Sequence, residues 1–142
     1  MRLRRTRLRS ASEEGAAAVE FALVVPLLLT LLFGIIEFGA AYNAQILVTN
    51  AAREAARELS VEDGASTGSA TATADAVLAP IGLTVKTNPS PFSVSGTAVN
   101  PGGRLCGTGQ ELTVTLKVDR STLTGLFGPF ELTGKAVRLC AG

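Results

Sequence analysis

Gly15 and Glu20 are the residues of this chain whose types and spacing could take part in chemistry. They lie between an arginine-rich start and a long apolar run, Phe21 to Ile36. A charged group at bilayer depth costs roughly 2.5 to 3.5 kcal/mol on insertion scales, so an acidic residue that opens an apolar span usually has a specific cationic partner. If the bond between Gly15 and Ala16 were cut, the released α-amino group, with a reference pKa of about 7.7 to 8.0, would supply that cation four residues before Glu20.

Two interpretations of Glu20 stay open on spacing alone. In the first, a neighbouring subunit presents its amine to Glu20 inside a packed bundle of helices. This ion pair would set the axial register between subunits, because any other stagger leaves a buried charge without its partner. In the second, Glu20 lies at the inner headgroup level, where its charge costs little.

The residues around Glu20 carry a family resemblance. The segment Gly-Ala-Ala-Ala-Val-Glu-Phe, residues 15 to 21, resembles the processing site of type IV pilin-like proteins, in which a prepilin peptidase cuts after the glycine and a glutamate is fifth in the mature chain. The longer stretch GAAAVEFALVVPLLLTLLFGIIEFGAAYNAQILVTNAAREAAR, residues 15 to 57, closely resembles the TadE-like minor pilins, or pseudopilins, of tight-adherence (Tad/Flp) pilus systems.

This resemblance implies a role in pilus assembly. Gly15 and Ala16 would carry the cleavage site, and Glu20 and Phe21 would contact a neighbouring subunit. The implied partners are the prepilin peptidase, the major pilin, other minor pilins and the membrane platform of the assembly machine. Pilus function would connect the chain to surface adhesion and biofilm.

Charge and hydropathy predict a single membrane span with its N-terminus in the cytoplasm. The basic leader, residues 1 to 15, holds five arginines and two glutamates, a net charge of +3 that keeps this end inside. Residues 16 to 41 are the predicted transmembrane helix in the lipid bilayer, and Pro26 predicts a bend there, with the Thr30 hydroxyl able to relieve the lost hydrogen bond. A nucleic-acid partner is not expected, because the arginines adjoin a membrane span and no base-reading module follows.

Beyond the span, the helix is predicted to continue outside the membrane over residues 42 to 62. Its apolar residues recur every three or four positions, and we expect this stripe to pack on the chain's own ectodomain rather than on a partner. Asp63-Gly64 should end the helix. Residues 63 to 82 read as a small-residue linker over Ala65 to Thr73 and a short helix over Ala70 to Ala79.

Residues 83 to 142 should form a small β-rich domain, because apolar and polar residues alternate there. Strands are expected at Leu83 to Thr87, Phe92 to Ser95, Leu112 to Val118 and Phe130 to Val137. The predicted fold is therefore pilin-like and α+β: a long N-terminal helix packed on one face of a small antiparallel sheet. Cys106 and Cys140, both in the exported part, should form one disulfide, although two free thiols remain an alternative.

Several kinds of chemistry are not expected. The chain has no histidine, which excludes Ser-His-Asp and Cys-His nucleophiles and the usual zinc sites. No Walker loop or dinucleotide fingerprint follows a predicted strand. We therefore expect no enzyme activity, no metal and no cofactor.

Two other functions remain as alternatives. The chain could be a secreted soluble domain released by signal-peptide cleavage near Ala41, although Glu37 and the continuing helical pattern argue against this. It could also be an uncut membrane-anchored binding domain, which would leave Glu20 unexplained.

Overall fold

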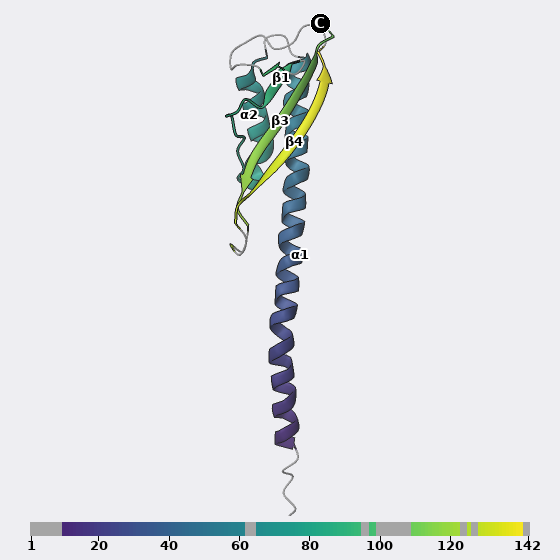
Figure 1. Cartoon of the computed structure of the whole chain (residues 1–142), viewed down its shortest axis with the longest axis vertical. Coiled ribbons are helices and arrows are strands. Elements are labelled where there is room, and N and C mark those ends of the chain that lie inside the picture. Colours follow the sequence, from purple (N-terminus) through teal and green to yellow (C-terminus); the bar gives the residue numbers. More distant parts are fainter. Residues whose placement is uncertain are drawn as a thin grey trace, which may run out of the picture. The chain divides into compact units, whose positions relative to one another are not determined.

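The computed structural model describes residues 10–61, 65–94, 97–98, 109–122, 125 and 128–140. Cys106, the predicted helix end at Asp63-Gly64 and most of the leader lie outside the described residues. The chain divides into two compact units, Met1–Phe38 and Gly39–Gly142. Helix α1, Ser10–Val61, supplies residues to both units, and Figure 1 shows it labelled together with α2, β1, β3 and β4.

The first unit consists of the N-terminal part of α1. Its many alanines and leucines propagate a helix with little loss of side-chain entropy. Pro26 lies inside the helix without ending it. The large apolar side chains of this part are exposed, so the helix here is not held by a core of its own chain.

The second unit is built on the C-terminal part of α1. The helix continues beyond Tyr42, and its apolar stripe is buried within this unit. The stripe consists mainly of alanines, which let other elements approach the helix axis closely. Its buried members are Ala44, Val48, Ala51, Ala52, Ala55, Ala56, Leu59 and Ser60.

Helix α2, Thr67–Leu78, begins within the stretch predicted as a linker. Ser66 caps it: the Ser66 hydroxyl accepts from Ser69 N–H, and the Ser69 hydroxyl accepts from Ser66 N–H, at 3.1 and 3.0 Å. This reciprocal pair satisfies two backbone donors that a helix start leaves free, which is why the helix begins at Thr67 rather than Ala70. A short 3-10 turn, η1 (Ala79–Ile81), follows, and Gly82 ends it with a φ of 67°.

The sheet has four antiparallel strands in the order β2-β1-β3-β4. They are β1 (Phe92–Val94), β2 (Thr97–Ala98), β3 (Glu111–Arg120) and β4 (Phe130–Leu139). The long β3–β4 hairpin pairs residue for residue from Glu111↔Leu139 to Arg120↔Phe130. The predicted α+β fold, a long helix with a small antiparallel sheet, is confirmed.

The strand predicted over Leu83 to Thr87 is wrong. This segment has no regular structure, and one backbone hydrogen bond, from Lys86 N–H to the Lys117 carbonyl at 2.9 Å, joins it to β3. Pro89 and Pro91 follow, and neither has an N–H to extend a ladder. The alternation was nevertheless informative about burial, because Leu83 and Val85 each keep only 9% of their surface exposed.

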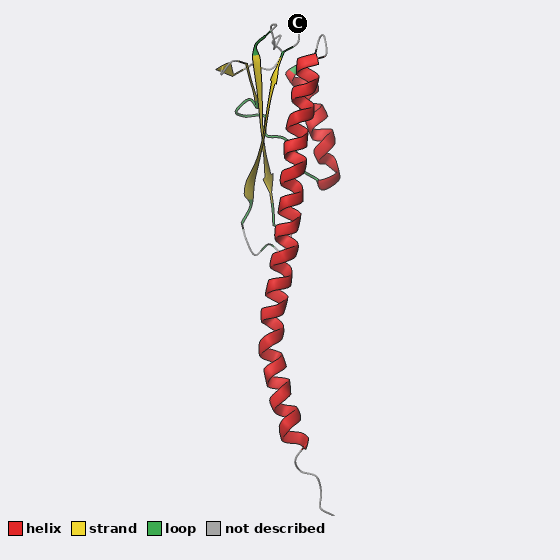
Figure 2. Ribbon diagram, turned by 90° about the vertical axis from the view of Figure 1, so that its right-hand side faces the viewer, coloured by secondary structure: helices red, strands yellow, loops and turns green. Residues whose placement is uncertain are grey.

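The core lies between the sheet and the two helices. Figure 2 shows α1 and α2 on one side of the sheet, which is seen edge-on. Alternate residues of β3, from Leu112 to Val118, are fully buried on this side, while the intervening side chains are polar and face outward. The sheet therefore packs one face on the helices and leaves the other wet, as the sequence predicts.

Candidate functional site

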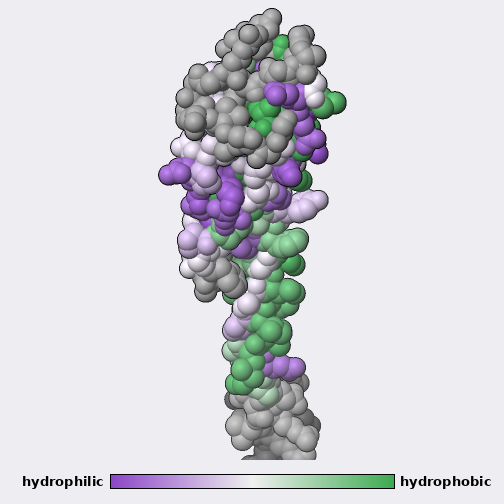
Figure 3. All heavy atoms as spheres, turned by 45° about the horizontal axis from the view of Figure 1, so that its top comes forward, coloured by the Kyte–Doolittle hydropathy of each residue, from purple (hydrophilic) through white to green (hydrophobic). Residues whose placement is uncertain are grey.

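The candidate site is the exposed apolar surface of the N-terminal half of α1. Within the described residues, one helix is long and apolar enough to cross a membrane, and none of its most apolar window is buried. Phe21 is 70% exposed and Phe38 74%. Figure 3 shows hydrophobic side chains (green) gathered along the helix where it leaves the sheet. Apolar surface of this extent needs a cover of lipid or of other helices.

The residues predicted for cleavage and subunit contact lie within seven positions of one another on this helix, from Gly15 to Phe21. Gly15, Ala16, Glu20 and Phe21 all lie in α1, and all are exposed. Ala16 and Glu20 are four residues apart, so they share one helix face and are separated by about 6 Å along the axis. An α-amino group at Ala16 and the Glu20 carboxylate would therefore lie on the same side of each subunit. Their roles stay predictions.

Around Pro26 the structure differs from one detail of the sequence analysis. The proline nitrogen cannot donate to the carbonyl of Ala22, one turn earlier. The Thr30 hydroxyl does not replace that donor, because it donates to the Pro26 carbonyl at 2.8 Å. The bond satisfies the hydroxyl inside an apolar stretch. The predicted bend at Pro26 stays a prediction.

Cys140 lies directly after β4 and is 4% exposed. Its N–H donates to the Gln110 carbonyl at 2.9 Å, and its carbonyl accepts from Gly109 N–H at 3.2 Å. The backbone around Cys140 is thus fixed to the start of β3. The disulfide with Cys106 stays a prediction.

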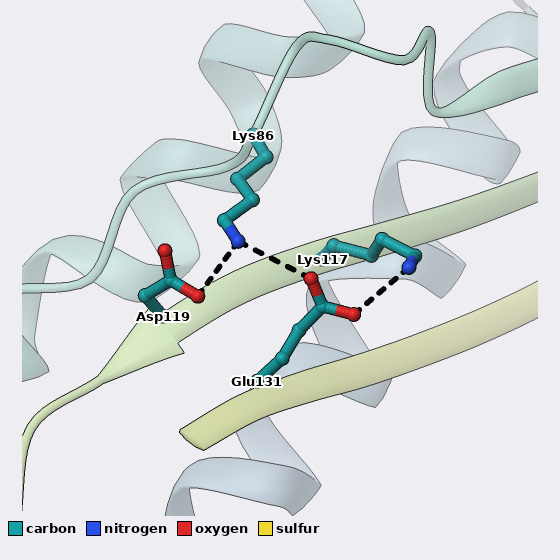
Figure 4. A network of polar contacts seen from close by, with 4 residues as sticks. All are labelled: Lys86, Lys117, Asp119 and Glu131. Atoms are coloured by element: carbon teal, nitrogen blue, oxygen red, sulfur yellow. Dashed lines mark hydrogen bonds and ion pairs between the residues drawn. The ribbon is translucent and has the colours of Figure 1, made fainter. Parts of the chain in front are cut away.

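Four charged side chains of the second unit form a small network on the outer face of the sheet (Figure 4). Lys86 Nζ lies 2.7 Å from Asp119 and 3.2 Å from Glu131, and Lys117 Nζ lies 2.8 Å from Glu131. Hydrogen bonds from Lys117 and Lys86 lower the pKa of Glu131, and hydrogen bonds to Asp119 and Glu131 raise the pKa of Lys86. These side chains remain 37 to 59% exposed, so the network is a solvated surface feature. Among the described residues no group of three or more acidic or cysteine side chains could hold a metal ion.

Sequence reasoning missed two residues that position the sheet on α1. Gln45 Nε2 donates to the Thr133 carbonyl at 2.8 Å. At Gly134 a Cβ would lie 2.5 Å from the Val48 carbonyl oxygen, so only glycine fits there. A glycine inside a strand pattern is a known sign of close backbone approach and could have identified Gly134. Nothing in the sequence singles out Gln45.

A comparison with family models supports the resemblance drawn from the residues. The model described as TadE-like protein matches residues 15–57, from the candidate cleavage site to near the end of the buried stripe. The match associates the chain with Tad pilus systems, whose TadE-like members are pilus components and not enzymes. Comparisons with curated proteins and with solved structures find no match.

Proposed function

We propose that this chain is a minor pilin of a Tad pilus, processed after Gly15 and inserted through its N-terminal helix. The observation that carries the proposal is the coincidence of three features in one segment. The large apolar side chains between residues 19 and 42 are exposed, Glu20 lies one helical turn after Ala16, and the TadE-like match begins at Gly15.

The proposed sequence of events follows from charge and hydropathy. The arginines of the leader hold the N-terminus in the cytoplasm, so the ectodomain is extracytoplasmic. The prepilin peptidase then removes the leader and leaves a cationic amine on Ala16. Until assembly, lipid covers the apolar helix. During assembly the major pilin, other minor pilins and the membrane platform replace the lipid, and the pilus contributes to adhesion and biofilm.

Glu20 would direct this exchange. In a bundle of helices, its carboxylate and the amine of a neighbouring Ala16 each need the other, since removing one partner of a buried pair costs about 3 to 5 kcal/mol. Only the axial offset between neighbouring helices that brings the carboxylate and the amine together leaves no buried charge without a partner. Phe21, next to Glu20 and 70% exposed, would pack against the same neighbour.

The first test is N-terminal sequencing, with intact mass, of the protein from native membranes. We expect the chain to start at Ala16. A start at Tyr42 would instead identify a secreted domain, and an intact leader would identify a membrane anchor or a cell without the peptidase. Either of these results would contradict the proposal.

The second test is the Glu20→Ala variant. We expect it to be inserted and cut normally but to be lost from pili sheared off the cells, because its neighbour's amine has no buried partner. The matched control is Glu111→Ala, which removes an exposed carboxylate from β3 and should leave the content of sheared pili unchanged. Normal incorporation of Glu20→Ala would refute the ion pair.

A further inference from the structure

The two edge strands of the sheet, β2 and β4, run in opposite directions. Each neighbouring pair in the order β2-β1-β3-β4 is antiparallel, so β1 and β4 share one direction and β2 and β3 share the other. In two copies placed side by side with their strands aligned, β4 of one copy and β2 of the next would be antiparallel. Antiparallel strands can form a regular ladder.

The outer edge of β4 presents backbone groups that no strand uses. Cys140, just after β4, faces β3, because its N–H donates to the Gln110 carbonyl. Backbone groups alternate along an antiparallel strand, so the odd-numbered residues of β4 direct their N–H and C=O away from β3. Thr133 agrees with this assignment, since its carbonyl accepts from Gln45 instead. Among the described residues no strand pairs with this edge.

The two halves of this edge differ in protection, although Arg138 also places an exposed charge near the C-terminal end of β4. At the Phe130 end, Gln45 occupies the Thr133 carbonyl and Lys135 adds a charge, and both features discourage another strand. At the other end the outward side chains are Val137 and Leu139, which are 49% and 70% exposed. An open edge with exposed apolar side chains is a template for pairing.

The short strand β2 lies level with this unprotected half. The printed pairings run across the sheet from Ala98 to Ser93, then to Thr113, and then to Val137. The next row runs from Thr97 to Val94, then to Leu112, and then to Arg138. A neighbouring copy that is not shifted along the strands would therefore place its β2 opposite the exposed part of β4.

We propose that the β4 edge of one copy pairs with the β2 edge of a second copy of this chain. The proposal rests on the proposed function in one respect: neighbours anchored in the same membrane share one orientation. A two-fold β4–β4 pair would instead set the equivalent strands of the two copies in opposite directions, and it is one of the outcomes that the test distinguishes. The β4–β2 contact joins different surfaces, so it does not close on two copies and can add subunits in a row.

The test is site-specific photo-crosslinking of the full-length chain in native membranes. Benzoyl-phenylalanine placed at Val137 or Leu139 should give a covalent dimer whose link maps by mass spectrometry to the peptide that contains Thr97 and Ala98. The matched control carries the same group at Asp119, which is also on the outer face of the sheet. Asp119 lies about 20 Å along β3 from Thr113, the residue that pairs with Val137. This control should give no link to that peptide.

Val137→Pro tests the backbone ladder. It removes an N–H that points away from β3, so the hairpin should keep its own ladder. The link from Leu139 should then fall at least tenfold. Val137→Lys, which adds a charge to the edge without touching the backbone, should do the same if the proline variant does not fold. A link from β4 to β4, a link only to another protein, or no link in the folded protein would each overturn the proposal.

The crosslink is also measured in the Glu20→Ala background. That variant stays in the membrane, so the β4–β2 link should persist at the wild-type level even when pilus incorporation is lost. Loss of incorporation with no link in either background would remove the edge contact and leave the proposed function standing. If the link formed in a protein whose chain starts at Tyr42, the edge contact would stand and the proposed function would be refuted.

Discussion

At the scale of single residues, Gly134 is the most constrained position in the ectodomain. Its Cα lies against the backbone of α1, where an added Cβ would be 2.5 Å from the Val48 carbonyl oxygen and 2.7 Å from its carbonyl carbon. Backbone atoms cannot move aside as the end of a flexible side chain can. The helix and β4 must therefore separate, or the strand must shift, to admit any side chain.

We predict that Gly134→Ala destabilises the folded ectodomain by about 3 kcal/mol, the upper end of the usual cost of overpacking. The thermal unfolding midpoint of the detergent-solubilised chain would measure it. Gly128→Ala is the matched control, because a Cβ at Gly128 meets nothing within 4 Å. Equal midpoints for the two variants would show that the close contact between Gly134 and the backbone of α1 does not affect the stability of the fold.

At the scale of elements, the charge network joins the irregular segment before β1 to the β3–β4 hairpin, to which the backbone of Lys86 contributes one hydrogen bond. Lys86 belongs to the irregular segment before β1, Lys117 and Asp119 to β3, and Glu131 to β4. The lowered pKa of Glu131 means that its stabilising effect is complete above the ordinary carboxyl value of 4.5 and is lost as the pH falls through the lower folded value. The raised pKa of Lys86 means that its stabilising effect is complete below the ordinary value of 10.5 and is lost as the pH rises through the higher folded value.

We therefore predict a shallow loss of stability below pH 4.5 that the Glu131→Gln variant lacks. Unfolding midpoints of both proteins between pH 3 and 7 would test this, and the difference should shrink in high salt because the groups are exposed. Glu111→Gln, at the other end of the hairpin, serves as the control. Parallel pH profiles for wild type and Glu131→Gln would rule out a contribution from the network.

The elements also show what the sequence could and could not predict. The period of the buried residues was enough for α1, β3 and β4, because long elements repeat their pattern many times. It failed at Leu83 to Thr87, where alternation reported burial correctly but could not report the backbone partners. The Gln45–Thr133 bond joins residues 88 positions apart, and no local signal encodes such a contact. The candidate site stays a prediction: Gly15 to Phe21 are close in the sequence, so a local pattern was enough to propose them, whereas the proposed partners would lie on other molecules.

At the scale of the whole molecule, the core and the exposed apolar surface are separate along the chain. Every buried core residue lies between Ala44 and Cys140. Most of the large exposed apolar side chains lie before residue 47. The N-terminal part of the chain, with its exposed apolar side chains, is thus followed in the sequence by the part that forms the core, with little overlap between them.

We predict that a chain starting at Gly39 is folded and stays in solution without detergent, because it keeps the whole core. Circular dichroism and gel filtration would test this. The full-length chain is the control, and it should aggregate in the same buffer because its N-terminal helix is uncovered. An unfolded or aggregated Gly39 chain would show that the first unit contributes to the fold.

The long course of α1 without a basic residue also determines how this protein is detected by peptide mapping. No lysine or arginine occurs between Arg9 and Arg53, so trypsin leaves residues 10 to 53 as one very apolar peptide. Such a peptide is poorly extracted and poorly ionised. Tryptic mass spectrometry would therefore record this chain only through the peptides after Arg53 and would miss the end that cleavage after Gly15 would create. Cleavage at carboxylates, such as Glu20 and Glu37, would recover that end.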